Sequence, residues 1–133
     1  TTARLISKGI LENNALSILN ADDPNVAQMV PDSQRLFYGL ELIETESLGS
    51  NLNSELSYCA KCGEEYTYTS RFYGQLGHYH CDNCGNKRPQ PDIVVDQLSI
   101  HTNGSDFRLR SEQISLQISL KLPGLFNVYN ALS

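Results

Sequence analysis

The chain has 133 residues, 40% of them hydrophobic, which predicts one ordinary core in one domain, or one domain with a small insert. A formal net charge of −5 argues against nucleic-acid binding by the whole chain, because phosphate contacts need clustered Lys and Arg. No apolar run approaches the roughly 20 residues of a membrane-spanning helix, and no charged-then-apolar leader is present, so we expect no transmembrane segment.

The first 40 residues predict helices and strands in alternation. Residues 3–12 carry apolar side chains at helical spacing, and residues 15–19 form a short apolar run typical of a strand buried on both faces. A second helix over residues 24–30 and a second strand over residues 35–40 are expected to follow. Short links between such elements are typical of a parallel α/β sheet with right-handed crossovers.

A polar segment, Asn20-Ala21-Asp22-Asp23-Pro24, follows the first predicted strand. An Asp just before a Pro favours the start of a helix, because the carboxylate caps free N–H groups and Pro fits the first helical position. Open α/β sheets also bind ligands at the carboxyl ends of their strands. Two interpretations therefore stay open: Asp22 or Asp23 only caps a helix, or the capping occurs beside a nucleotide site.

All four cysteines lie in two Cys-x-x-Cys-Gly hooks, which eighteen residues separate: Cys59, Cys62, Cys81 and Cys84. Zn²⁺ prefers four soft ligands in a tetrahedron, and two such hooks on facing turns supply them. The glycine after each second cysteine tolerates the positive φ of such a turn. The spacing predicts a zinc site, with a pair of disulfides or a redox dithiol as the alternatives. Cysteines in metal spacing suit a reducing compartment, so cytoplasm is the default.

Residues 41–55 are rich in polar residues and predict a linker into a compact zinc ribbon over residues 56–91. Residues 66–69 and 78–80 alternate like the strands of a hairpin, with bends expected at Gly74 and Gly77.

The ribbon region holds six of the chain's eleven aromatic residues. Exposed tyrosines can stack on bases, but its charge balance is only one positive, so we favour aromatic side chains that cover the metal site. His78 and His80 are surplus as ligands, and we expect them on the strand surface or as hydrogen-bond donors to thiolates.

The last third of the chain predicts an antiparallel meander that covers the core on one face. Residues 93–100 are strand-like, Asn103-Gly104 favours a tight turn, and residues 106–110 form the returning strand. Residues 114–122 alternate strictly between apolar and polar, which is typical of a half-buried strand.

A final helix is expected after Pro123-Gly124, with Asn127 and Asn130 one turn apart on one face. Two amides so placed can present a donor and an acceptor to a planar ligand edge such as adenine. The alternative is a polar stripe on a half-exposed helix.

Three features in this order resemble the Mur ligase family. Residues 19–24, Leu-Asn-Ala-Asp-Asp-Pro, are similar to the Asn-x-Asp-Asp motif of its central domain, and residues 122–132 are similar to its Gly-x-x-Asn-x-x-Asn-Ala motif. A four-cysteine ribbon between them, followed by Lys87-Arg88-Pro89, resembles the members that amidate lipid II with a GatD-type glutaminase subunit. The resemblance covers nearly the whole chain.

The resemblance implies an α/β fold: part of a Mur-ligase-type central ATPase domain in residues 1–55 and 92–133, with parallel strands, an antiparallel meander and a Cys₄ ribbon inserted at residues 56–91. It implies an ATP-dependent carbon–nitrogen ligase of peptidoglycan synthesis. ATP and Mg²⁺ would activate the α-carboxylate of D-glutamate in lipid II as an acyl phosphate, and ammonia from the glutaminase would convert it to D-isoglutamine. The lipid-linked substrate would bring the enzyme near the inner face of the bacterial membrane.

The resemblance also implies roles for particular residues. Asn127 and Asn130 would lie at the adenine, with Asn20 and Asp22 on the nucleotide side of the sheet. The four cysteines would hold structural zinc, and no residue of this chain is assigned to catalysis.

The sequence also departs from the family pattern. It lacks the Gly-rich phosphate loop with its Lys-Thr pair and the upstream Mg²⁺ ligands, it lacks the C-terminal ligase domain, and Ser133 stands where the family often has alanine. We therefore expect an excised piece of a longer protein, inactive alone and binding ATP feebly or not at all.

Two other classes of protein are retained as alternatives. One is a free-standing zinc-ribbon adaptor for protein or nucleic acid, which has no need of the flanking Asn motifs. The other is a redox enzyme, which needs a thiol that titrates near neutrality.

Overall fold

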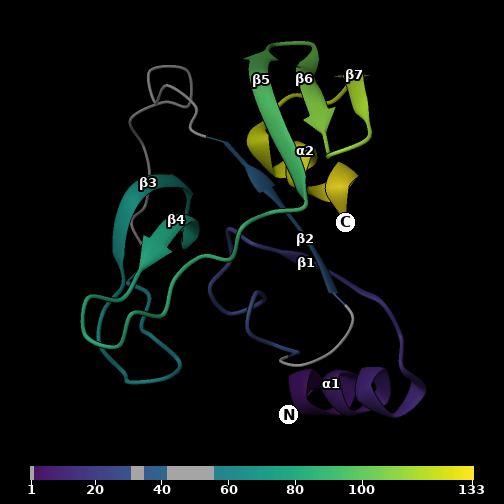
Figure 1. Cartoon of the computed structure of the whole chain (residues 1–133). Helices are drawn as coiled ribbons and strands as arrows, with labels where there is room; N and C mark the ends of the chain where they lie inside the picture. Colours follow the sequence, from purple (N-terminus) through teal and green to yellow (C-terminus); the bar gives the residue numbers. More distant parts are fainter. Residues whose placement is uncertain (1, 31–34, 42–55) are drawn as a thin grey trace.

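The computed structural model describes residues 2–30, 35–41 and 56–133 (Figure 1). The predicted linker lies outside the described residues, apart from Glu41. The described elements, in chain order, are α1 (Thr2–Asn13), β1 (Ser17–Asn20), β2 (Arg35–Leu40), β3 (Thr67–Tyr73), β4 (Leu76–His80), β5 (Ile93–His101), β6 (Gly104–Arg110), β7 (Ser115–Leu120) and α2 (Leu125–Leu132).

One mixed sheet of five strands forms the centre of the molecule, in the order β1-β2-β5-β6-β7. The strands β1, β2 and β5 are parallel, and Tyr38 of β2 pairs with Asn20 on one side and Ile93 on the other. The strands β5, β6 and β7 are antiparallel neighbours. The parallel strands and the meander are therefore both confirmed, and β2 is buried over its last four residues because it lies between two parallel neighbours.

The helix expected over residues 24–30 is wrong: this segment is a series of turns. The Asp23 carboxylate does cap the N–H groups of Asn25 and Val26, at 2.9 and 3.4 Å. One helical backbone bond follows, from Ala27 N–H to Asp23 O at 2.9 Å, but Met29 N–H bonds only three residues back. A segment this short gains too few intrahelical bonds to offset the cost of starting a helix, so turn geometry prevails.

Two glycines expected at bends lie instead inside strands. Gly104 begins β6 and pairs with His101, so the tight turn uses the two residues before it. Gly77 lies in β4. A Cβ atom would lie 2.2 Å from Leu120 O at Gly104 and 2.2 Å from Ser70 O at Gly77, so close backbone approach requires both glycines.

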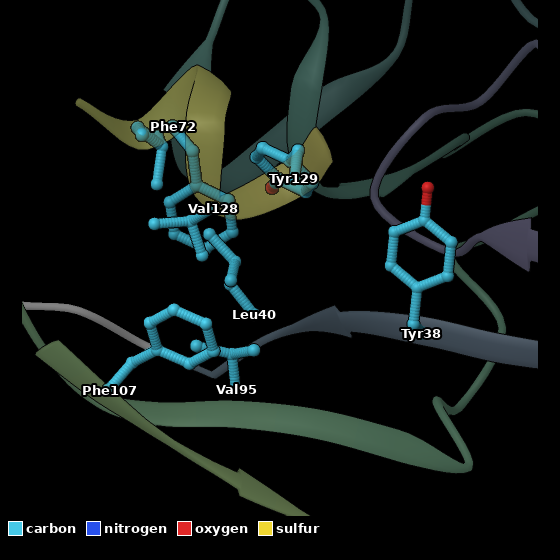
Figure 2. Packing of buried hydrophobic residues seen from close by; sticks show 8 residues of the cluster. Tyr38, Leu40, Phe72, Val95, Phe107, Val128 and Tyr129 are labelled. Atoms are coloured by element: carbon cyan, nitrogen blue, oxygen red, sulfur yellow. The ribbon is translucent and has the colours of Figure 1, made fainter. Parts of the chain in front are cut away.

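The main core lies between one face of the sheet and α2 (Figures 1 and 2). Figure 2 shows side chains of α2 above those of β2, β5 and β6, and Phe72 of β3 packs beside α2. The buried members of this core are Tyr38, Leu40, Phe72, Val95, Phe107, Leu125, Val128 and Tyr129. The ribbon hairpin therefore supplies part of the same core as the sheet.

The strand β7 is less buried than its alternating sequence predicts. Ile118 and Leu120 pack partly against the core, but Ile114, Leu116 and Leu122 are each more than half exposed. The reason is that β7 is the edge strand of the sheet, so among the described residues it has a strand neighbour on one side alone. No helix in the described part of the chain is both long and apolar enough to cross a bilayer.

We expect Val128→Ala to lower the free energy of unfolding by about 2 kcal/mol, because two methyl groups leave a closed core at about 0.8 kcal/mol each and a cavity remains. Val128 is fully buried in α2. Urea unfolding measures the effect, with Leu116→Ala as the control, since Leu116 is 51% exposed. Equal losses in the two variants would contradict the packing of α2 on the sheet.

A second prediction concerns a carboxylate on the sheet face opposite α2. Arg108 donates to both oxygens of Asp96 at 2.7 and 2.8 Å, and Arg110 donates to one at 3.2 Å. The hydrogen bonds from Arg108 and then Arg110 lower the pKa of Asp96, against the effect of burial. A lowered folded-state pKa stabilises the fold above the unfolded pKa of about 4, and that contribution is lost as the pH falls through the folded value.

Arg108→Met should therefore cost no more than about 1 kcal/mol at pH 7, because this arginine is a third exposed. The difference between the variant and the unchanged chain should shrink below pH 4. Urea unfolding at pH 7 and at pH 3 measures it, and a difference independent of pH would contradict the assignment.

Candidate metal centre

The four cysteine sulfurs form one compact cluster at the base of the β3–β4 hairpin. All four Sγ atoms lie within 4.8 Å of one another. Across the two hooks, Cys59 Sγ lies 3.5 Å from Cys84 Sγ, and Cys62 Sγ lies 3.4 Å from Cys81 Sγ. Tetrahedral zinc with bonds of about 2.3 Å holds its sulfurs about 3.8 Å apart, so this donor set fits a single zinc ion.

The two hooks have the same backbone geometry. Gly63 N–H donates to Cys59 O at 2.8 Å, and Gly85 N–H donates to Cys81 O at 2.9 Å. The φ angles of these glycines are 80° and 73°. The positive φ predicted after each second cysteine is therefore confirmed, and it turns each hook so that both of its sulfurs face the same point.

Local hydrogen bonds favour the thiolate that zinc requires. Burial opposes ionisation of Cys59, but the Asn86 side chain and the backbone of Lys61 and Cys62 lower its pKa to about 5. The backbone N–H of Asn86 also acts on Cys84, yet burial and the three neighbouring thiols raise the pKa of Cys84 to about 12. Adjacent sulfurs oppose each other's ionisation, so a divalent cation is the partner that lets all four act as thiolates.

Asn86 is a functional residue that the sequence did not single out. Its Nδ2 lies 3.5 Å from Cys59 Sγ and donates to the Tyr66 hydroxyl at 2.8 Å. The same hydroxyl accepts a hydrogen bond from Gln28 Nε2 at 2.9 Å, which ties the segment after β1 to the ribbon. The position of Asn86 directly after the second hook is the signal that could have revealed it, because a short amide there reaches back to sulfur.

Two buried tyrosines pack against the cysteines, as we predicted when we favoured covering of the metal site over stacking on bases. Tyr66 and Tyr79 are 4% and 2% exposed, and their rings meet edge to face with centroids 4.9 Å apart. Burial, before any other cause, raises the pKa of Tyr66 to about 12. Of the two histidines, His78 Nε2 lies 2.8 Å from Leu40 O, and His80 Nε2 lies 3.1 Å from an Asp82 oxygen. Neither histidine belongs to the metal-ligand cluster of the described residues.

Asp22, predicted on the nucleotide side of the sheet, is fully buried and uses both carboxylate oxygens. Oδ1 accepts a hydrogen bond from Arg88 Nε at 2.6 Å. Oδ2 accepts one from Leu40 N–H and one from the Tyr129 hydroxyl, both at 2.8 Å. Asn20 Oδ1 accepts a hydrogen bond from Asp22 N–H at 2.9 Å, so the structure brings these two predicted residues together at the end of β1.

The other two predicted residues lie on α2. Asn127 is half-buried and donates from Nδ2 to Pro123 O at 2.8 Å, one turn earlier. Asn130 is exposed. Tyr129 lies between them in sequence and reaches Asp22, so the structure connects α2 to the end of β1. A nucleotide role for these four residues stays a prediction.

The five-stranded mixed sheet defines the class of this protein by its similarity to a solved structure. The fold is similar to that of a pseudomurein peptide ligase type C from Methanothermus fervidus, with a TM-score of 0.74 and 35% identity, covering 86% of this chain and 22% of that one. The chain therefore has the fold of a peptide-ligase segment.

Curated relatives point to a particular subunit. MurT of lipid II isoglutaminyl synthase (glutamine-hydrolyzing) from Staphylococcus aureus strain COL is 32% identical, over 96% of this chain and 28% of its own length. MurT from Streptococcus pneumoniae is 30% identical, over 90% of this chain and 26% of its own length. No family model matches the chain. These similarities support a MurT fragment, and the chain spans little more than a quarter of the length of these relatives.

Proposed function

We propose that this chain is part of an ATP-dependent carbon–nitrogen ligase subunit that amidates the α-carboxylate of D-glutamate in lipid II. The observation that carries the proposal is the similarity to MurT over nearly the whole chain, at 32% identity. Residues 1–55 and 92–133 would be portions of the central ATPase domain, and residues 56–91 would be its ribbon insert.

Within that subunit, the chain's own residues would bind and orient the nucleotide. Bound ATP with Mg²⁺ would supply the phosphoryl group that makes the carboxylate electrophilic. Asn127 and Asn130 would contact the adenine edge, a role that the exposure of Asn130 permits. Asn20 and Asp22 would act on the same side of the sheet, with Asp22 holding α2 through Tyr129. The four cysteines would hold a structural zinc.

The proposal includes a partner and a place of action. A GatD-type glutaminase subunit would supply ammonia, since the relatives are subunits of a glutamine-hydrolysing enzyme by name. The enzyme would act in the bacterial cytoplasm, near the inner face of the membrane that carries lipid II. The chain on its own would have no activity, because its sequence lacks the phosphate loop.

The adaptor alternative is less well supported. A free-standing zinc-ribbon adaptor needs no α/β sheet around its ribbon, but the ribbon of this chain shares a core with β2, β5, β6, β7 and α2. The flanking Asn motifs lie at the end of β1 and on α2, next to that core rather than within the ribbon.

The proposed function is tested in a complete subunit that contains this chain, mixed with a glutaminase subunit, lipid II, ATP and glutamine. Mass spectrometry of the product should show the carboxylate converted to an amide, with one ADP formed per amide. Asn130→Leu should raise the KM for ATP on the order of tenfold, because it removes about 1 to 2 kcal/mol of hydrogen bonding to the base.

Asn13→Leu is the matched control, because Asn13, like Asn130, is an exposed asparagine on a helix, and its side chain donates to Gly9 O at 2.8 Å. An unchanged KM for ATP in Asn130→Leu would remove the adenine role. A complete subunit that forms no amide would contradict the proposed reaction.

A further inference from the structure

A buried ion pair joins the ribbon to the end of the parallel strands. Arg88 lies three residues after the second cysteine hook. Its Nε donates to Asp22 Oδ1 at 2.6 Å, and its Nη2 donates to Leu40 O at 3.0 Å. The Arg88 side chain is 14% exposed and that of Asp22 is fully buried. Gly39 leaves the necessary space, since a Cβ there would lie 2.6 Å from Arg88 and 2.9 Å from Asp22.

The ribbon determines where Arg88 lies. Arg88 N–H donates to Tyr79 O of β4 at 3.0 Å, and the preceding Lys87 forms a β-bridge with His80. The β3–β4 hairpin also contacts the segment that contains Asp22, because Gly77 N–H donates to Asp22 O at 2.9 Å. The backbone and the side chain of Asp22 are thus both held by residues of the ribbon.

Asp22 also contacts α2. The Tyr129 hydroxyl donates to Asp22 Oδ2 at 2.8 Å, and burial and then the negative charge of Asp22 raise the pKa of Tyr129, which keeps the hydroxyl protonated as a donor. Phe72 of β3 packs into the same core as Val128 and Tyr129 (Figure 2). One polar contact and one apolar contact therefore connect the ribbon with the helix that carries Asn127 and Asn130.

We propose that Arg88 and Asp22 are positioning residues that couple the folded ribbon to α2, so that the metal-bound ribbon keeps α2 in the orientation needed at the nucleotide. The last clause rests on the proposed function, whereas the coupling itself does not. The ribbon is then a brace for the nucleotide side of the sheet, in addition to being a folded unit of its own.

Amide hydrogen exchange on the zinc-loaded chain tests the coupling without any nucleotide. Arg88→Met should keep one zinc per chain, while amides of α2 and of residues 20–23 exchange at least about tenfold faster, a larger increase than at amides of β6. Arg88→Lys should restore part of the protection, because it keeps the charge beside Asp22 but lacks the fork that also reaches Leu40 O.

Arg108→Met is the matched control. It removes an arginine that bonds a carboxylate through both oxygens on the opposite face of the sheet. This variant should change the exchange of α2 much less than Arg88→Met does, and no more than it changes that of β6. Equally fast exchange in α2 for both variants would indicate general loosening and would overturn the proposal.

If Arg88→Met does not fold, Tyr129→Phe tests the coupling in its place. This variant removes only the hydroxyl that bonds Asp22 and keeps the ring in the core. It should speed exchange at residues 20–23 with zinc retained and with β3 and β4 unaffected. Normal exchange at residues 20–23 in this variant would overturn the coupling.

Removal of zinc by EDTA is a second test of the coupling. Chelation should speed exchange of α2 in the unchanged chain by at least the factor seen in Arg88→Met, and should add less in that variant, because the Arg88 contact is already lost there and only the packing of Phe72 remains to be lost. Unaltered exchange of α2 after zinc removal would overturn the proposal.

The effect of the ribbon on nucleotide binding is tested separately in the complete subunit. There, Arg88→Met should raise the KM for ATP more than it lowers kcat, and Arg88→Lys should rescue part of that change. An unchanged KM for ATP together with faster exchange in α2 would overturn the role in nucleotide binding and would support the coupling between the ribbon and α2. A complete subunit that forms no amide reports instead on the proposed function.

Discussion

Cys81→Ser is expected to lose the bound metal and to unfold the ribbon while most of the five-stranded sheet persists. Cys81 is 1% exposed, so a serine there places a neutral hydroxyl in a buried site built for a soft thiolate. Structural zinc contributes on the order of 10 kcal/mol of binding free energy to the fold of a small unit, which the remaining contacts of this ribbon cannot replace.

Elemental analysis and the amide exchange of β3 and β4 measure this loss. Thr69→Val is the control, because Thr69 is an exposed residue of β3 whose hydroxyl donates to the His78 carbonyl, at 3.2 Å, away from the cysteines. That variant should keep both the metal and the protected hairpin. A Cys81→Ser chain with a full complement of zinc and a protected hairpin would show that Cys81 is not a required ligand.

Asp22→Asn is expected to cost about 3 to 5 kcal/mol of unfolding free energy, because it leaves the Arg88 charge largely buried without its counter-charge. The asparagine keeps the size of the side chain but presents an N–H₂ group to at least one of the three donors Arg88, Leu40 and Tyr129. Urea unfolding measures the loss.

Asp23→Asn is the matched control, since its side chain caps Asn25 and Val26 at a half-buried position and should cost about 1 kcal/mol or less. Adding Arg88→Met to Asp22→Asn should recover part of the loss, because removal of both charges leaves none unpaired. Equal losses in Asp22→Asn and Asp23→Asn would contradict the buried ion pair.

Patterns local in sequence predicted much of this molecule. The strand at residues 35–40 is correct to the residue, because its apolar run lies between two parallel neighbours. The meander followed from alternation, and the metal cluster followed from the spacing of two hooks. In each case the pattern that predicts the feature lies in residues close together in the chain, so the sequence alone carries the signal.

The partners of Asp22 could not be predicted in this way. Arg88 lies 66 residues further along the chain and Tyr129 lies 107 residues further, so no spacing rule connects them. At residues 24–30, where the predicted helix is wrong, a segment too short for a stable helix is also held by a distant contact, from Gln28 to Tyr66 of the ribbon. Gly77 and Gly104 look like turn residues in sequence, but the approach of a neighbouring strand is what requires them.

The most direct test of the account is the metal content of the chain as purified, measured by elemental analysis beside a count of reactive thiols. The account predicts about one zinc per chain, with thiols that react fully only after chelation. No metal, together with four reactive thiols in a folded chain, would contradict the zinc site and the brace built on it, and would leave the likeness to MurT resting on the sheet and the two Asn motifs.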